Sequence, residues 1–402
     1  MTSARTARIA LVATLAIQIY TSFAATATAV LAPEIANTFG VDPRWIGLFV
    51  GIVYAGAMLA GLASGGFIER FGSIRVSQGG VALCAVATLA VAATPQGLTV
   101  ALAIAALVIG LGYGPITPAS SQLLQRTATP SRMALTFSIK QTGVPAGVAL
   151  SGAILPIAAL ALGWRATFAL VALAGAAVVV LSQPIRAGLD AERHPNRSLS
   201  VAAIVGPLAI LRGSPALLML ALVSFAYSAT QVCLTSFLVV HLTGALGYPL
   251  VSAGLILTAT TIAGAIGRIA WGVVADRLLA PHRTLALIGA IAAACAVAMA
   301  LSTRAWPTAA IVGLAACFGA TAIGWNGVQL AEVARLAPPG AAGKVTGATS
   351  VVTFAGVVVG PPLFALLADM TGSDRAGFAM LAAASGAASA ALVARRAHTI
   401  AS

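Results

Sequence analysis

The chain alternates between long apolar runs and short polar gaps over its whole length. Twelve of the runs are long enough to cross the hydrocarbon core of a bilayer, which takes about 20 apolar residues in a helix. They cover about 9–32, 45–68, 76–94, 98–122, 133–158, 164–182, 216–242, 250–275, 284–302, 306–330, 346–368 and 376–394. The pattern predicts an all-α membrane protein with twelve transmembrane helices.

The longest polar gap separates the sixth run from the seventh and divides the chain into two halves. We expect an N-terminal six-helix half over 1–183, a cytoplasmic linker over 184–214 and a C-terminal six-helix half over 215–402. Within the linker, the segment from Ser200 to Leu211 predicts a short surface helix. Two parallel halves around a central site are a known way to build a secondary transporter.

An internal repeat supports this division. A shift of 207 residues superposes several identical residues of the two halves, namely Tyr20 on Tyr227, Gly65 on Gly272, Arg70 on Arg277 and Gln122 on Gln329. A slightly shorter shift aligns Lys140 with Lys344. The nearly constant offset predicts pseudo-symmetric halves.

Basic residues outnumber acidic ones, and the formal net charge is +13. On a soluble protein such a charge would suggest nucleic acid as a partner. Here, with the N-terminus inside, sixteen of the 22 Lys and Arg residues fall in inside segments and four in outside segments. The positive-inside rule then predicts a bacterial inner-membrane protein with both termini in the cytoplasm and no nucleic-acid partner. Lys140 and Arg268, the remaining two, fall within spans.

All nine acidic residues lie at the end of a span or in a loop. They are Glu34, Asp42, Glu69, Asp190, Glu192, Asp276, Glu332, Asp369 and Asp374. The charges that enter the spans are therefore positive, and a cavity with net positive charge attracts anions. This distribution argues against the export of cationic drugs.

Arg268 lies eight residues before Asp276, about 12 Å deeper along a helix. Its guanidinium can donate two parallel hydrogen bonds to a carboxylate and stays charged at accessible pH. We expect Gly264, Gly267 and Gly272 to leave room beside it. The alternative is an arginine that extends to the inner surface or pairs with an acid in a loop.

Lys140 lies at a similar depth, eight residues after Arg132. If its helix begins later than expected, it is instead a surface lysine. Uncharged polar and aromatic residues within the spans complete the candidate substrate site; they are Gln18, Tyr20, Tyr113, Tyr227, Gln231, Trp325 and Asn326. Tyr113 and Thr117 are expected on one face of helix 4. The alternative for each of these residues is a contact between helices.

The segment from Gly65 through Glu69, Arg70 and Gly72 to Arg75 resembles the signature loop of the major facilitator superfamily. Gly272 to Arg277 resembles the copy of this loop in the second half, and Gly143-Val-Pro-Ala-Gly resembles the family's fifth helix. The resemblance covers essentially the whole chain. It implies the twelve-helix fold of that family and transport by alternating access.

The segment from Gly267 to Asp276 also resembles the eighth helix of oxalate/formate exchangers and monocarboxylate transporters. In those relatives the arginine that matches Arg268 contacts the substrate carboxylate. Helices 5 and 8 are neighbours in the family, so Lys140 and Arg268 are expected to approach one anion. The oxalate exchangers use a lysine within helix 11, and the span from Gly347 to Asp369 has none, which favours a monocarboxylate.

Charged residues at the cytoplasmic helix ends are candidates for gating. They are Glu69, Arg70, Arg126, Asp276, Arg277, Glu332 and Arg335. The resemblance implies that Glu69 and Asp276 take part in ion pairs that hold the inner side closed. The alternative is loop charge that only keeps the loops in water.

No Walker motif, HExxH or CxxC is present, which argues against ATP-driven transport, an enzyme, a cofactor and a metal site. The four cysteines are interpreted as packing residues, and His241 is the histidine that could relay a proton. The sequence therefore predicts a monomeric transporter of a small organic anion, coupled by proton symport or by exchange for a second anion. The alternatives are an exporter of drugs or neutral metabolites and, with less support, a membrane-embedded sensor.

Overall fold

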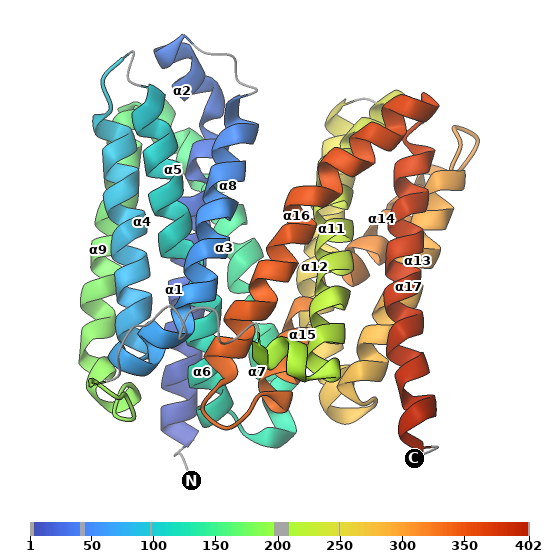
Figure 1. Ribbon diagram of the computed structural model, residues 1–402. Coiled ribbons are helices and arrows are strands. Elements are labelled where there is room, and N and C mark those ends of the chain that lie inside the picture. Colours follow the sequence, from blue (N-terminus) through green and yellow to red (C-terminus); the bar gives the residue numbers. More distant parts are fainter. Residues whose placement is uncertain (1–3, 41–44, 97–98, 197–208, 249, 401–402) are drawn as a thin grey trace. The chain divides into compact units, whose positions relative to one another are not determined.

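The computed structural model describes residues 4–40, 45–96, 99–196, 209–248 and 250–400. Within these residues, twelve helical segments are long and apolar enough to cross a membrane, which confirms the predicted fold class (Figure 1). The surface helix expected from Ser200 to Leu211 lies almost wholly outside the described residues.

Contacts between residues divide the chain into two units. Unit 1 consists of Met1–Ala128, Lys140–Gly213 and Ala337–Val351. Its helices are α1 (Ala4–Val30), α2 (Ala32–Phe39), α3 (Trp45–Phe71), α4 (Ser73–Ala93), α5 (Thr99–Tyr113), α6 (Ile116–Thr127), α8 (Gly143–Leu162) and α9 (Trp164–Leu189). The last of these helices runs beyond its expected end near 182 and includes the start of the segment expected as a linker.

Unit 2 consists of Thr129–Ile139, Ser214–Leu336 and Val352–Ser402. Its elements are η1 (Pro130–Arg132), most of α7 (Met133–Gln141), α11 (Pro215–Gly244), α12 (Leu250–Arg277), α13 (Pro281–Leu301), α14 (Thr308–Ala322), α15 (Asn326–Leu336) and α17 (Arg375–Ile400). The helix α16 (Ala342–Thr371) begins in unit 1 and ends in unit 2. Each unit therefore includes a short segment from the other half of the sequence.

Two spans are interrupted at corresponding places in the two halves. The fourth span breaks between Tyr113 and Ile116, and the tenth breaks between Ala322 and Asn326. Glycines pack the first part of each broken span tightly against a neighbour. A Cβ atom at Gly110 would overlap the backbone of Val53 on α3, and one at Gly319 would overlap the backbone of Thr260 on α12. The matched breaks are consistent with the sequence repeat.

Local sequence sets the ends of several helices. Gly72 has φ 95° between α3 and α4, a conformation that glycine adopts without strain. Pro215 and Pro281 stand in the first turns of α11 and α13, where a missing N–H costs nothing. The Ser214 hydroxyl accepts from Leu217 N at 3.4 Å and caps α11.

Candidate substrate-binding site

Lys140 is a buried lysine of unit 1, with 1% of its surface exposed. Its Nζ donates to Gln18 Oε1 at 2.7 Å and to Gln141 Oε1 at 2.9 Å, and it has a longer contact with Thr117 Oγ1 at 3.5 Å. These three acceptors are uncharged. The alternative of a surface lysine is wrong, because the ammonium lies among the side chains of α1, α6 and α7.

The elements around Lys140 meet because two spans are irregular here. Thr117 lies just after the break between α5 and α6, and α7 ends at Gln141, one residue after the lysine. On α1, Gln18 is fully buried and uses both ends of its amide. Its Nε2 donates to Ser22 Oγ at 3.2 Å, so its Oε1 faces Lys140. The amide therefore holds the ammonium in place.

Arg268 is the buried arginine of unit 2, with 2% of its surface exposed. Its Nε donates to the carbonyl oxygen of Ile323 at 3.0 Å. Ile323 lies in the break between α14 and α15, where a backbone carbonyl can accept from a side chain. The arginine side chain is thus bonded inside the span and does not extend to the surface.

Trp271 reinforces the same junction. It follows Arg268 by three residues, and so lies on the same face of α12. Its Nε1 donates to Ala320 O at 2.9 Å. The break in the tenth span therefore offers two carbonyls to two side chains of α12. The sequence interpretation missed this role of Trp271, although the spacing of three from Arg268 was a readable signal.

The glycines beside Arg268 do not leave the room that the sequence analysis expected. A Cβ atom at Gly267 would overlap the backbone of Ala320, and one at Gly264 would overlap the side chain of Ile323. A Cβ at Gly272 would overlap Ser138. This expectation was wrong, because glycines on a membrane helix serve equally well to bring a second helix close.

Trp325 places an aromatic ring in the same region of unit 2. It is 1% exposed, and its Nε1 has no hydrogen-bond partner. The ring contacts that of Tyr227 edge-on, with centroids 5.8 Å apart. Next to it, Asn326 Nδ2 donates to Gln231 Oε1 at 3.1 Å. An indole N–H buried without an acceptor is costly and suits a ligand that accepts a hydrogen bond.

Tyr20 and Tyr227, which the repeat aligns, occupy matching positions in their own units. A Cβ atom at Gly175 of α9 would overlap the Tyr20 hydroxyl, and one at Gly289 of α13 would overlap the Tyr227 hydroxyl. The Tyr227 hydroxyl donates to Leu285 O at 2.8 Å. Both phenol groups therefore pack against another helix of their unit, which is the alternative that the sequence left open.

Tyr113 and Thr117 do not share one continuous helix face. Tyr113 is the last residue of α5 and Thr117 lies in α6, beyond the break. Pro115 at the start of α6 prevents the helix from continuing with regular hydrogen bonds. The expectation of a shared face was wrong for this reason.

Glu69 pairs with Lys344 at the start of α16. Lys344 Nζ lies 2.6 Å from Glu69 Oε1, and both side chains are mostly buried. Arg70 stacks on the ring of Phe71, with its Cζ 5.3 Å from the ring centroid. The backbone of Glu69 also accepts from His194 N at 2.7 Å, so the start of the linker is fastened to this loop.

Asp276 caps the start of α7. Its two carboxylate oxygens accept from Ala134 N at 3.0 Å and from Leu135 N at 2.8 Å. A carboxylate at a helix N-terminus satisfies backbone N–H groups and interacts favourably with the helix dipole. The neighbouring Arg277 is exposed. Glu69 and Asp276, aligned by the repeat, thus both bond to the beginning of another helix.

The other three gating candidates, Arg126, Glu332 and Arg335, form ion pairs within their own halves of the sequence. Arg126 Nη1 lies 2.6 Å from Glu192 Oε2, and its Nη2 donates to Leu189 O at 3.0 Å. Arg335 donates two hydrogen bonds of 2.7 Å to Glu332 on the same helix. Arg126 therefore fastens the end of α9, and Glu332 is neutralised within α15.

His241 lies in a buried chain of polar groups at the end of α11. Its Nδ1 is 2.8 Å from Asp374 Oδ2, and its Nε2 is 2.9 Å from Ser302 Oγ. The serine donates its own proton to Met299 O at 2.7 Å. The two ring nitrogens of His241 thus lie within hydrogen-bond reach of a carboxylate and a hydroxyl. The hydrogen bond with His241 is the main reason why the pKa of Asp374 lies below its usual value.

Cysteines and potential metal ligands add no further site. Cys84, Cys233 and Cys295 are buried, as expected of packing residues, whereas Cys317 is exposed. Among the described residues, no group of three or more His, Cys, Asp or Glu side chains is placed to hold a metal ion.

Comparison with known proteins places the chain in a family. Residues 14–361 match the family model of the Major Facilitator Superfamily. An uncharacterized MFS-type transporter of Mycobacterium tuberculosis (strain CDC 1551 / Oshkosh) is 26% identical over 339 residues, which cover 84% of this chain and 74% of the relative. The hexuronate transporter of Bacillus subtilis is 23% identical over 303 residues, which cover 69% of each chain.

Solved structures agree on the fold. The fucose:proton symporter of E. coli aligns over 97% of this chain and 99% of its own, with a TM-score of 0.75 and 16% sequence identity. Likeness at that identity extends to the fold. The family model covers most of the sequence, and the matched proteins are transporters and not enzymes. The chain therefore belongs to the Major Facilitator Superfamily of multi-pass membrane transporters.

Proposed function

We propose that this transporter moves a small organic anion with a single carboxylate across the bacterial inner membrane by alternating access. The observation that carries the proposal is the burial of Lys140, whose Nζ donates to the amide oxygens of Gln18 and Gln141. A charged group inside a membrane span is costly and often marks a substrate pathway. An anion that enters would gain a charge-assisted hydrogen bond from the ammonium.

The arrangement around Lys140 suggests how an anion would bind. A lysine ammonium has three N–H donors, and the described contacts are with Gln18, Gln141 and Thr117. The contact with Thr117 is the longest at 3.5 Å. A carboxylate oxygen would displace this contact first, since a charge-assisted hydrogen bond is about twice as strong as a neutral one.

Arg268 is the second proposed carboxylate ligand. Its Nε is bonded to Ile323 O, which fixes the plane of the guanidinium. A fixed planar group recognises a carboxylate with less loss of side-chain entropy than a flexible one. Of the remaining candidates we retain Gln18, Trp325, Gln231 and Asn326 as ligand contacts.

The chemistry of one relative supports a carboxylate with neighbouring hydroxyl groups. The B. subtilis relative is a hexuronate transporter, and a hexuronate carries one carboxylate on a sugar ring. The unpartnered indole N–H of Trp325 and the amides of Gln231 and Asn326 are suited to hydroxyl oxygens. A hydroxylated monocarboxylate is therefore the first class of substrate to test.

We further propose that Glu69 and Asp276 act in gating. The Glu69–Lys344 ion pair and the bonds from Asp276 to α7 each join residues of the two sequence halves. Contacts that form and break in turn are suited to control access.

We also propose that both termini lie in the cytoplasm, on the basis of the positive-inside rule.

The test uses the full chain in proteoliposomes with a panel of labelled monocarboxylates, including a hexuronate, and matched dicarboxylates. We expect uptake of a monocarboxylate that Lys140→Gln lowers at least roughly 30-fold, as expected for loss of a buried charge partner. Lys140→Arg should retain part of the activity. Arg268→Gln should lower the uptake to a similar extent.

Two exposed basic residues provide controls. Arg283→Gln changes an exposed arginine in the first turn of α13, and Arg132→Gln changes one that lies eight residues before Lys140. Both variants should transport at the wild-type rate. Wild-type uptake by both Lys140→Gln and Arg268→Gln would reject the proposed site. Uptake driven by an imposed pH gradient indicates proton symport, whereas uptake that requires an internal anion indicates exchange.

A further inference from the structure

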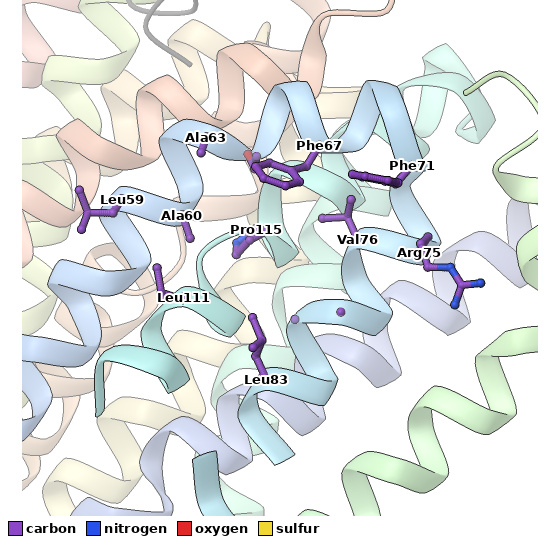
Figure 2. A pocket seen from close by; sticks show the side chains of 13 residues that line it. Leu59, Ala60, Ala63, Phe67, Phe71, Arg75, Val76, Leu83, Leu111 and Pro115 are labelled. Atoms are coloured by element: carbon purple, nitrogen blue, oxygen red, sulfur yellow. The ribbon is translucent and has the colours of Figure 1, made fainter. Parts of the chain in front are cut away.

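Unit 1 contains a groove that the transport site does not use. The groove has a volume of about 510 Å³ and lies between α3, α4 and the end of α5. Its walls include Leu59, Phe67, Phe71, Val76 and Leu83, and Arg75 lies at one end (Figure 2). We call it the α3–α4 groove.

The lining of this groove is apolar and open to the surroundings. Phe67 is 41% exposed and Leu83 is also 41% exposed, and the two phenyl rings of Phe67 and Phe71 stack with centroids 6.1 Å apart. The groove lies within three of the spans that cross the membrane. An occupant from the hydrocarbon phase would suit this apolar lining.

Two glycines of α4 help to form the α3–α4 groove. A Cβ atom at Gly80 would overlap the backbone of Gly112, so α4 and α5 touch there and form the floor. At Gly79, one residue earlier, a Cβ would meet nothing within 4 Å. A larger residue at Gly79 would therefore extend into the groove from an open position.

The groove has the length of one leaflet. Leu59 and Phe71 are twelve residues apart on α3, about 18 Å along a helix. Half of the hydrocarbon core is about 15 Å thick. An acyl chain that runs along the groove would thus extend from the bilayer centre to the polar surface.

Positive charge stands at the polar end of the groove. The Arg75 side chain is exposed and has one polar contact, with Gln78 Oε1 at 3.3 Å. The guanidinium of Arg70 lies over the ring of Phe71. The carboxylate of Asp190 accepts from the backbone N–H groups of Ile74 and Arg75.

We propose that the α3–α4 groove binds one acyl chain of an anionic glycerophospholipid, with the phosphate of its headgroup at Arg75 and Arg70. An apolar groove of leaflet length, with Arg75 at its end and Arg70 over the adjacent ring of Phe71, matches a molecule with an acyl chain and an anionic head. This site is independent of the proposed transport function.

The test uses the full chain in phosphatidylcholine nanodiscs that contain a small fraction of phosphatidylglycerol with a photoreactive acyl chain. In the wild type, the crosslinks should concentrate on residues 59–83. Gly79→Leu should remove most of this label. The matched control is Gly152→Leu on α8, another exposed glycine whose Cβ would meet nothing within 4 Å.

The headgroup is tested separately by native mass spectrometry. Arg75→Gln should lower the preference for phosphatidylglycerol over phosphatidylcholine roughly fivefold, as expected for one basic residue near an anionic headgroup. Leu83→Trp is a second variant that fills the groove, for use if Gly79→Leu does not elute as a folded monomer. The proposal is overturned by label spread evenly over all the spans, by unchanged label in both filled variants, or by a second copy of the chain crosslinked at the groove.

Discussion

The ammonium of Lys344 lies 2.6 Å from a carboxylate oxygen of Glu69, so an acid of α3 is paired with a base at the start of α16. The repeat aligns Lys344 with Lys140, yet the two lysines have different surroundings. One is neutralised by a carboxylate, and the other is held by amide and hydroxyl oxygens. Two copies of the same sequence feature thus have different neighbours.

Loss of the Glu69–Lys344 pair should destabilise the protein. Glu69→Gln removes a charge-assisted bond between two largely buried side chains, and we expect a loss of roughly 1.5–3 kcal/mol. Thermal unfolding in detergent measures this change. The exchanged variant Glu69→Lys with Lys344→Glu should recover part of it, whereas Glu192→Gln, whose carboxylate is 73% exposed, should cost less than about 1 kcal/mol. Equal effects of Glu69→Gln and Glu192→Gln would contradict the prediction.

Asp276 should behave as a helix cap. Asp276→Ala leaves the N–H groups of Ala134 and Leu135 without their acceptors, which should cost about 0.5–2 kcal/mol. Asp276→Asn keeps one acceptor and should cost less. The measurement is the unfolding midpoint together with hydrogen exchange of the first turn of α7. Asp369→Asn, at an exposed acid near the end of α16, is the control, and protection of α7 that is unchanged in Asp276→Ala would argue against a cap.

Acid should weaken the contact of His241 with Asp374. Hydrogen bonding to His241 holds the pKa of Asp374 below its usual value, against the opposing effect of burial. A carboxyl whose pKa is depressed in the folded state stabilises it above the unfolded pKa, near 3.9, and loses this contribution as pH falls through the folded pKa. The wild type should therefore lose stability as pH falls below about 4.

His241→Asn tests the origin of this acid sensitivity. The variant removes the imidazole that bonds to Asp374, so its unfolding midpoint should fall less steeply over the same pH interval. His194→Asn changes an exposed histidine and should retain the wild-type slope. A wild-type slope in His241→Asn would mean that another carboxyl is responsible.

The contact between Tyr227 and Gly289 and the contact between Tyr20 and Gly175 should each give non-additive effects on stability in double variants. Gly289→Ala places a methyl group against the Tyr227 hydroxyl and should cost roughly 1–3 kcal/mol. Tyr227→Phe removes the hydroxyl, so the double variant should be more stable than the sum of the two single changes implies. Gly175→Ala with Tyr20→Phe should repeat this result, measured by thermal unfolding. Gly386→Ala, where a Cβ makes an ordinary contact, is the control, and additive effects in both pairs would contradict the packing described here.

The spans and the repeat were predictable because both leave a strong pattern in the sequence. Long apolar runs are required wherever a helix crosses the hydrocarbon core, and polar gaps mark its ends. The break in the fourth span also had a local signal in Pro115. The break in the tenth span has no proline between Ala322 and Asn326, and it was not predicted.

The hydrogen-bond partners of the buried charges were much harder to predict than the positions of these charges along the helices. The depth of Arg268 and Lys140 followed from helix geometry, but Ile323 O and Gln18 as their acceptors depend on how separate helices pack. The expectation of open space beside the glycines of α12 was wrong for the same reason. A glycine leaves space that either a ligand or a neighbouring helix can fill, and the packing of the helices determines which of the two does.

The bond from Arg268 to a backbone carbonyl has a consequence for how this protein can evolve. Every residue has a carbonyl, so no ordinary replacement of Ile323 deletes the acceptor itself. The side chains of Trp325, Gln231 and Asn326 can change while the charge stays anchored. Descendants of this chain can thus vary the neighbouring side chains without first having to rebuild the support of their arginine.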